Sequence, residues 1–209
     1  MCFRPAMLFT PELLVSELQL LRTLLRTEAL QCSCNCQVVS RSQWHARTPK
    51  EIDYISTPVN MVFIHHTSMD SCFNLTSCIE EMQKIQDFHM DTRGWFDIGY
   101  NFLVGEDGRV YVGRSWNREG AHTLHFNRVA IAVSVMGDFM QRLPNNLALD
   151  AVKNILDYGV CLGKITPNYR LYGHRDVRET SCPGDKFYQL IQTWKHYSHT
   201  KPSPSSIIG

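Results

Sequence analysis

A short apolar run that ends in two histidines places the strongest limit on the fold of this chain. Residues 61–66 read MVFIHH, with large and β-branched side chains up to the first histidine. A compact run of this composition predicts a buried β-strand, and the Thr67-Ser68 pair that follows predicts a loop. The chain is therefore expected to build a sheet around this strand.

The next segment has the periodicity of a helix. Residues 77–90 read SCIEEMQKIQDFHM, and Ser77 with Glu80 matches the capping-box pattern that begins a helix. Apolar side chains recur along one helical face, as expected for packing on a sheet: Ile79, Met82, Ile85 and Phe88. A strand followed by a helix is the predicted unit.

Further strands and helices alternate along the rest of the chain. Residues 100–113 hold two extended segments around Asp107-Gly108, which indicates a β-hairpin. The remaining predicted elements are a central strand at 129–137, a helix from Asn146 to near Gly163, a strand at 169–174 and a helix at 185–194. This interleaving indicates an α/β domain with a mixed central β-sheet flanked by helices, over residues 37–200.

Length and charge limit the class of protein. The 209 residues suffice for one ordinary globular domain and a modest extension, and residues 201–209 are expected to form a flexible tail. The 21 basic and 20 acidic residues are balanced. Nucleic acid is not an expected partner, because proteins that bind it concentrate basic charge on one face or arm.

The first 36 residues are expected to form a helical extension and a cysteine cluster. In residues 11–30, Leu14, Leu18, Leu21 and Leu25 recur at helical spacing, which predicts an amphipathic helix. This helix either lies on the domain or binds a partner or a membrane surface. Charges interrupt any signal-peptide core, and no apolar run is long enough to span a membrane.

The chain contains eight cysteines, of which Cys72 and Cys78 enclose a short loop that a disulfide is expected to close. That loop contains the glycosylation sequon that begins at Asn74. The role of Cys32, Cys34 and Cys36 is open, because their alternating spacing fits neither a zinc knuckle nor an easily closed disulfide.

Two histidines and one cysteine follow predicted strands in a way that suits a metal. His65 ends one strand, His174 ends another, and Cys182 follows eight residues later. Three protein ligands of this kind leave a fourth position for water, as hydrolytic zinc requires. His65 and His66 point to opposite faces of an extended chain, so only one of them is expected to reach the ion.

Other interpretations of these residues remain open on spacing alone. Either histidine can be a hydrogen-bonded strand-end residue without a metal. Cys182 can be the nucleophile of a Cys-His protease or part of a structural disulfide.

Several linked motifs, spread over residues 37–197, resemble the peptidoglycan recognition proteins, whose domain is similar to the bacteriophage type 2 amidases. The motifs are VFIHHTS, FHMDTRGWFDIGYNFLVGEDGRVYVGRSWNREGAHT, LYGHRDVRETSCPG and TWKHY. The resemblance implies a mixed β-sheet flanked by helices, with a zinc site at one end of a groove for peptidoglycan or muropeptides. It also implies His65, His174 and Cys182 as zinc ligands.

The same resemblance implies roles for further side chains. Tyr100 and Thr180 match positions associated with amidase activity. The groove residues that it implies are Thr67, His89, Arg93, Gly94, Trp95, Arg114, His122 and Asn127. Gly94-Trp95 resembles the pair in relatives that prefer diaminopimelate in the stem peptide, whose extra carboxylate Arg114 is expected to bind.

The implied activity is that of a zinc-dependent N-acetylmuramoyl-L-alanine amidase acting in innate antibacterial immunity. The alternative is a receptor that binds peptidoglycan without cutting it; in such relatives a serine commonly replaces the cysteine ligand. The resemblance implies a secreted protein, and a cytoplasmic one is the alternative. It further allows a disulfide from the Cys32–Cys36 cluster to Cys161. Ser115 stands where glycine is frequent in the family.

Overall fold

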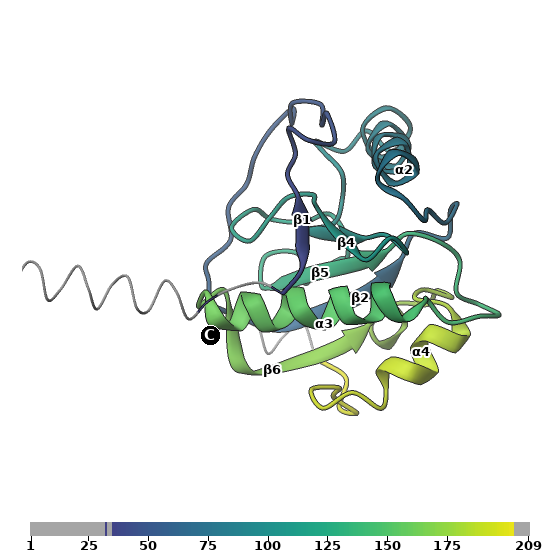
Figure 1. Cartoon of the computed structure of the whole chain (residues 1–209). Coiled ribbons are helices and arrows are strands. Elements are labelled where there is room, and N and C mark those ends of the chain that lie inside the picture. The colour runs from purple at the N-terminus through teal and green to yellow at the C-terminus, as the bar shows by residue number, and fades with distance from the viewer. Residues whose placement is uncertain (1–31, 33–34, 203–209) are drawn as a thin grey trace, which may run out of the picture. The chain divides into compact units, whose positions relative to one another are not determined.

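The computed structural model describes residue 32 and residues 35–202 (Figure 1). These belong, apart from Cys32, to the larger of the two units into which the chain divides, residues 34–209. The helix predicted at 11–30 and most of the predicted tail lie outside the described residues. Among the residues that are described, no helix combines the length and apolarity needed to cross a membrane.

A six-stranded mixed sheet forms the centre of the domain, in the order β1-β4-β3-β5-β2-β6. β3 and β4 pair antiparallel as the predicted hairpin, and the other neighbouring strands pair parallel. The strands are β1 (Gln37–Val39), β2 (Val59–His66), β3 (Phe102–Val104), β4 (Arg109–Val112), β5 (Ala130–Val135) and β6 (Ile165–Gly173). This confirms the α/β class and the buried strand predicted around residues 61–66.

Helices cover both faces of the sheet. They are α2 (Leu75–Asp87), α3 (Asn146–Cys161) and α4 (Asp185–Ile191), with a π-helical turn at Phe88–Thr92 and a 3-10 turn at His174–Asp176. Figure 1 shows α3 in front of the sheet, nearly in line with β2 and β6. Its apolar side chains pack with those of α4 and one sheet face in the largest core, whereas α2 packs in a separate core on the other face.

The strand alternation decides which core each side chain joins. Ile64 and Phe102 belong to the core under α3, whereas Leu103, the residue after Phe102, belongs to the core under α2. Because successive side chains on a strand point to opposite faces, His65 and His66 separate in the same way. The face of the sheet that carries α2 therefore also carries His65.

Two helix starts differ from those predicted. The N-cap of α2 is Asn74, whose Oδ1 accepts from Ser77 N at 3.0 Å while Ser77 Oγ accepts from Asn74 N at 3.3 Å. The predicted Ser77–Glu80 box is wrong because Ser77 already fills the third helical position of this earlier box. Likewise α3 is capped by Asn145, not Asn146, through the bond from Ala148 N to Asn145 Oδ1 at 2.9 Å.

Disulfide bonds join cysteines in several parts of the chain. Cys72 and Cys78 form one, with their Cα atoms 5.0 Å apart. Cys32, Cys36 and Cys161 are also disulfide-bonded. In addition, Asn154 Nδ2 on α3 donates to Asn35 O at 3.1 Å, so the segment before β1 lies against α3.

A buried carboxylate joins the β3–β4 turn to the start of α3. Glu106 is 2% exposed, and Arg142 donates to both of its carboxylate oxygens, at 2.8 and 2.6 Å. Asn145 N adds a bond to Glu106 Oε1 at 2.9 Å. Burial alone would raise the pKa of Glu106, but the bonds from Arg142 and Asn145 outweigh it, and the pKa is lowered.

This lowered pKa predicts a pH-dependent contribution to stability. A carboxyl with a lowered pKa stabilises the fold above the unfolded value of 4.5 and loses that effect as the pH falls through the folded value. Glu106→Gln should therefore lower the free energy of unfolding by about 1–2 kcal/mol at pH 7, and the gap to the unchanged protein should narrow at pH 3. Urea unfolding at both pH values measures it. Asp70→Asn, at an exposed carboxylate, should cost less than about 0.5 kcal/mol; an equal loss for both variants would contradict the prediction.

Candidate metal centre

Parallel pairing brings two histidines to one edge of the sheet. β2 pairs with β6 so that Ile64 lies opposite Gly173, which places His65 and His174 one residue beyond that pair. Because the carboxyl ends of parallel strands meet at the same edge, the two rings converge, with centroids 4.5 Å apart.

A pinned turn then returns Cys182 to the same edge. Arg175 N and Nε both donate to Cys182 O, at 3.1 and 3.4 Å, and Arg175 Nη2 donates to Ser181 O. Arg175 also pairs with Asp185 at 2.7 Å at the start of α4. Thr180 Oγ1 accepts from Cys182 N at 3.2 Å, so Thr180 supports the turn that presents the thiol.

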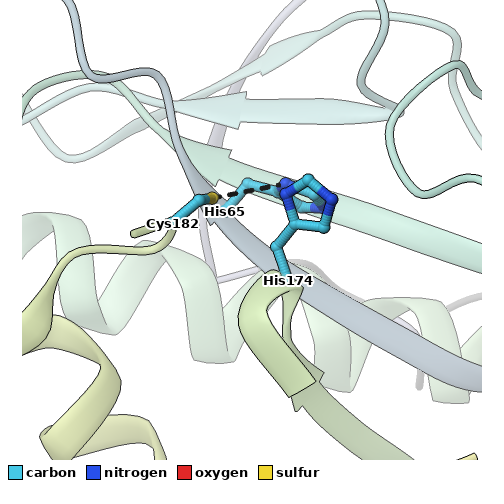
Figure 2. Close-up of side chains that lie close together, drawn as sticks. All are labelled: His65, His174 and Cys182. Atoms are coloured by element: carbon cyan, nitrogen blue, oxygen red, sulfur yellow. Dashed lines mark hydrogen bonds between the residues drawn. The ribbon is translucent and has the colours of Figure 1, made fainter. Parts of the chain in front are cut away.

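The three predicted ligands point toward one another (Figure 2). One donor atom from each of His65, His174 and Cys182 lies within 4.8 Å of the other two. Cys182 Sγ is 3.5 Å from His65 Nδ1. His65 is 1% and Cys182 8% exposed, whereas His174 is half-buried, so the cluster opens to solvent on the side of His174.

The burial of this cluster keeps its members neutral. Burial, and then His174, lowers the pKa of His65 well below 6.5. Burial, and then Arg178 and His66, lowers the pKa of His174 to about 4. Burial raises the pKa of the Cys182 thiol to about 12. Neutral imidazoles keep the lone pairs that a metal requires, and a divalent cation would supply the charge that stabilises the thiolate.

The donor set fits a zinc ion with an open position. Two imidazoles and one thiolate are a three-ligand set of the catalytic type. His174 Nε2 is buried and has no hydrogen-bond partner among the described residues, so protein contacts alone do not satisfy the cluster. Cys182 is a free cysteine in the part of the chain that is described, which removes the disulfide alternative. Its raised pKa is the opposite of what a cysteine nucleophile needs.

The neighbouring histidine takes a different part in the structure. His66 points away from the cluster, and its Nδ1 accepts from Phe139 N at 3.3 Å. Only its backbone reaches the thiol, through the bond from His66 N to Cys182 Sγ at 3.4 Å. Consequently His65 alone of the pair offers its ring to the cluster.

A cavity of about 730 Å³ lies beside the cluster. Seven of the predicted site residues line it together with His174: Thr67, His89, Arg93, Trp95, Tyr100, His122 and Asn127. Gly94 and Arg114 instead line an adjoining hollow of about 270 Å³, which shares Trp95 and Asn127 with the cavity. Thr180 lines neither hollow.

Tyr100 stands between the cavity and the cluster. Its ring centroid is 5.3 Å from that of His65. Burial, and then the nearby Cys182, raises the pKa of Tyr100 above its ordinary value of 10.0. The phenol therefore keeps its proton at neutral pH and can donate a hydrogen bond to a group that develops negative charge.

The walls of the two hollows are built by close packing. The rings of His89 and Trp95 stack with centroids 4.6 Å apart, and His89 Nδ1 accepts from Gly99 N at 3.1 Å. Gly94 directly precedes Trp95 in the sequence. Its φ is +71°, a conformation that favours glycine. Arg114 is 8% exposed and donates from Nε to Ile98 O at 2.7 Å.

Known proteins are similar to this chain over most of its length. The family model described as N-acetylmuramoyl-L-alanine amidase matches residues 55–185. Peptidoglycan recognition protein 1 of Bos indicus is 45% identical over 161 residues, which cover 77% of this chain and 85% of that protein. Peptidoglycan-recognition protein LB of Drosophila melanogaster is 42% identical over 164 residues, covering 78% and 71%.

The chain belongs to the peptidoglycan recognition protein family. Among solved structures, that of peptidoglycan recognition protein LE in complex with tracheal cytotoxin, a monomeric diaminopimelic acid-type peptidoglycan, superposes with a TM-score of 0.76. It is 41% identical, and the match covers 77% of this chain and 95% of that one.

Two residues at the site are not predicted by the sequence patterns. Thr123 lies between His65 and His122 and bonds to both rings. Arg178 lines the cavity and acts on His174 electrostatically. Thr123 follows a predicted groove histidine directly, which was the available signal, whereas the conformation of the 174–182 loop that places Arg178 has no local sequence pattern.

The departure from the family pattern at Ser115 has a backbone consequence. Ser115 has φ +63°, in the left-handed region that favours glycine. Its N donates to Asn101 O at 3.0 Å, and its carbonyl accepts from Asn101 Nδ2 at 2.8 Å. The bonds to Asn101 hold this conformation next to Arg114.

Ser115→Val should therefore destabilise the domain by about 1–2 kcal/mol, because a β-branched side chain tolerates the left-handed region poorly. Ser115→Gly, as the matched variant, should be at least as stable as the unchanged protein. Thermal unfolding of the three proteins measures the order. Equal melting temperatures for the valine and glycine variants would contradict it.

Proposed function

We propose that this protein is a zinc-dependent N-acetylmuramoyl-L-alanine amidase, which binds bacterial peptidoglycan and cleaves the amide between the lactyl group and L-alanine. The observation that carries the proposal is the convergence of His65, His174 and Cys182 within 4.8 Å beside a cavity of about 730 Å³. The family-model match to an N-acetylmuramoyl-L-alanine amidase over residues 55–185 supports the reaction class.

Zinc held by these three side chains supplies Lewis acidity that activates water at neutral pH. The chain then has three further tasks. The cavity holds the muropeptide so that the scissile amide lies near His174, which lines the cavity and belongs to the ligand cluster. Tyr100 keeps its proton and donates to the carbonyl oxygen as negative charge develops there. Thr180 holds the backbone of Cys182 in place.

Replacing the thiol separates cutting from binding. Cys182→Ser exchanges a thiolate for a hydroxyl, a far poorer zinc ligand. Release of stem peptide from a muropeptide should fall by at least about 100-fold, since even the loss of supporting contacts around such ligands costs 10- to 100-fold. Muropeptide affinity should change little, because Cys182 does not line the cavity. Mass spectrometry measures release, elemental analysis measures zinc, and calorimetry measures affinity.

Ser181→Ala is the matched control, because this exposed neighbour lies in the same turn and should retain zinc and release. A chelator should abolish release by the unchanged protein, and added zinc should restore it. Tight muropeptide binding without release by the zinc-loaded protein would instead identify a non-hydrolytic receptor.

We further propose that the preferred substrate is diaminopimelate-type peptidoglycan. Gly94, Trp95 and Arg114 line the hollow beside the cavity. The buried guanidinium of Arg114 can pair with the extra carboxylate of diaminopimelate. The relative peptidoglycan recognition protein LE, whose complex contains a diaminopimelic acid-type ligand, supports this choice.

Three muropeptides that differ at one group test this preference without altering the protein. The diaminopimelate form should bind about tenfold or more tightly than the lysine form, because a charge-assisted bond contributes about 1.5–3 kcal/mol. Amidation of the extra carboxylate should remove most of that difference. Calorimetry on one protein preparation gives all three affinities, and equal values would refute the preference.

We also propose that the protein is secreted and serves antibacterial immunity. Disulfides at Cys72–Cys78 and at Cys32, Cys36 and Cys161 support an oxidising compartment, since cytosolic thiols are kept reduced.

A further inference from the structure

A buried hydroxyl joins a ligand of the candidate metal centre to a cavity residue. Thr123 Oγ1 lies 3.2 Å from His65 Nε2 and 2.9 Å from His122 Nδ1. Thr123 and His65 are each 1% exposed, and His122 is 8% exposed. The three side chains therefore form a hydrogen-bonded chain that water does not reach easily.

The backbone under this chain is held in place. Asn127 Oδ1 accepts from both His122 N, at 3.0 Å, and Thr123 N, at 2.8 Å. Gly120 makes room for the ring, because a Cβ at that position would lie 2.5 Å from His122 Nε2. The dipeptide is thus fixed from two sides, and the hydroxyl of Thr123 is confined between the two imidazoles.

The number of available protons fixes which group donates in each of these hydrogen bonds once a metal is bound. A neutral imidazole has one N–H donor and one acceptor nitrogen, and a hydroxyl donates only one hydrogen. His65 Nδ1 faces Cys182 Sγ at 3.5 Å, so it is the nitrogen that ligates. His65 Nε2 must then carry the proton and donate to Thr123 Oγ1. The hydroxyl hydrogen is left for His122 Nδ1, so the proton of His122 lies on Nε2.

We infer that Thr123 is a positioning residue, which sets the tautomers of His65 and His122 together. It presents the Nδ1 lone pair of His65 to the metal and keeps the proton of His122 on Nε2. His122 lines the cavity with part of its ring, and its Nε2 is buried against Gly120. This inference rests on the proposed zinc site.

The supporting partners of metal-binding histidines typically contribute 10- to 100-fold to metal affinity. Thr123→Val keeps the shape of the side chain and removes the hydroxyl. We expect it to weaken zinc binding about tenfold or more in a chelator competition. Thr123→Ser restores the hydroxyl and should bind zinc within about twofold of the unchanged protein, which a purely structural role of the methyl group would not produce.

Thr166→Val is the matched control, because the hydroxyl of Thr166 on β6 is also buried but has no hydrogen-bond partner among the described residues. It should leave zinc affinity unchanged. Equal zinc affinities for Thr123→Val and Thr166→Val would overturn the inference.

A second measurement needs no variant and remains decisive if Thr123→Val does not fold. Long-range ¹H–¹⁵N NMR of the zinc-loaded protein distinguishes the two tautomers of each histidine. We expect both His65 and His122 to carry their proton on Nε2. A proton on Nδ1 of His122 would overturn the inference.

The outcomes also separate this inference from the proposed function. If the unchanged protein binds zinc without releasing stem peptide, the amidase proposal fails while the tautomer experiment still tests Thr123. If the unchanged protein binds no zinc, both fail.

Discussion

The parallel pairing of β2 with β5 on one side and β6 on the other is the constraint on which the site depends. Each strand ends at the same edge of the sheet, so residues more than 100 positions apart meet there without a long, unsupported loop. His65 arrives as the penultimate residue of β2 and His174 as the first residue after β6. The apolar cores on both faces fix these strands, and hence they fix the distance between the two rings.

The candidate centre is built from side chains whose burial disfavours their charged forms. Burial lowers the pKa of the histidines and raises that of the thiol, so the folded protein holds three neutral donors close together. Such an arrangement has little electrostatic strain before a cation binds, and a bound cation would stabilise the thiolate that remains when the thiol proton passes to solvent. The stability of the fold and the affinity for the ion therefore do not oppose each other at neutral pH.

Much of the fold could be predicted from the sequence because its signals are local. The apolar run before His65, the Asp107-Gly108 hairpin and the periodicity of α2 each report on their own segment. The helix starts were less predictable, since Asn74 and Asn145 compete with polar neighbours that cap equally well in isolation.

The site could be predicted from the sequence only in part. Histidines at strand ends suggested a shared rim, and the family motifs suggested which of them bind a metal. The contacts of Thr123 and Arg178 arise from irregular loops that side chains such as Asn127 and Asp185 hold in place, and no spacing rule encodes these.

The opposite orientation of adjacent histidines makes β2 unusually intolerant of length changes. Deletion of one residue upstream in the strand would leave an apolar segment that still pairs with both neighbours, yet it would turn His66 toward His174 and Cys182 and place His65 on the face that carries α3. Insertions and deletions here would thus yield folded molecules with a misdirected imidazole. Variation in chain length among relatives should consequently accumulate in the loops and not within this strand.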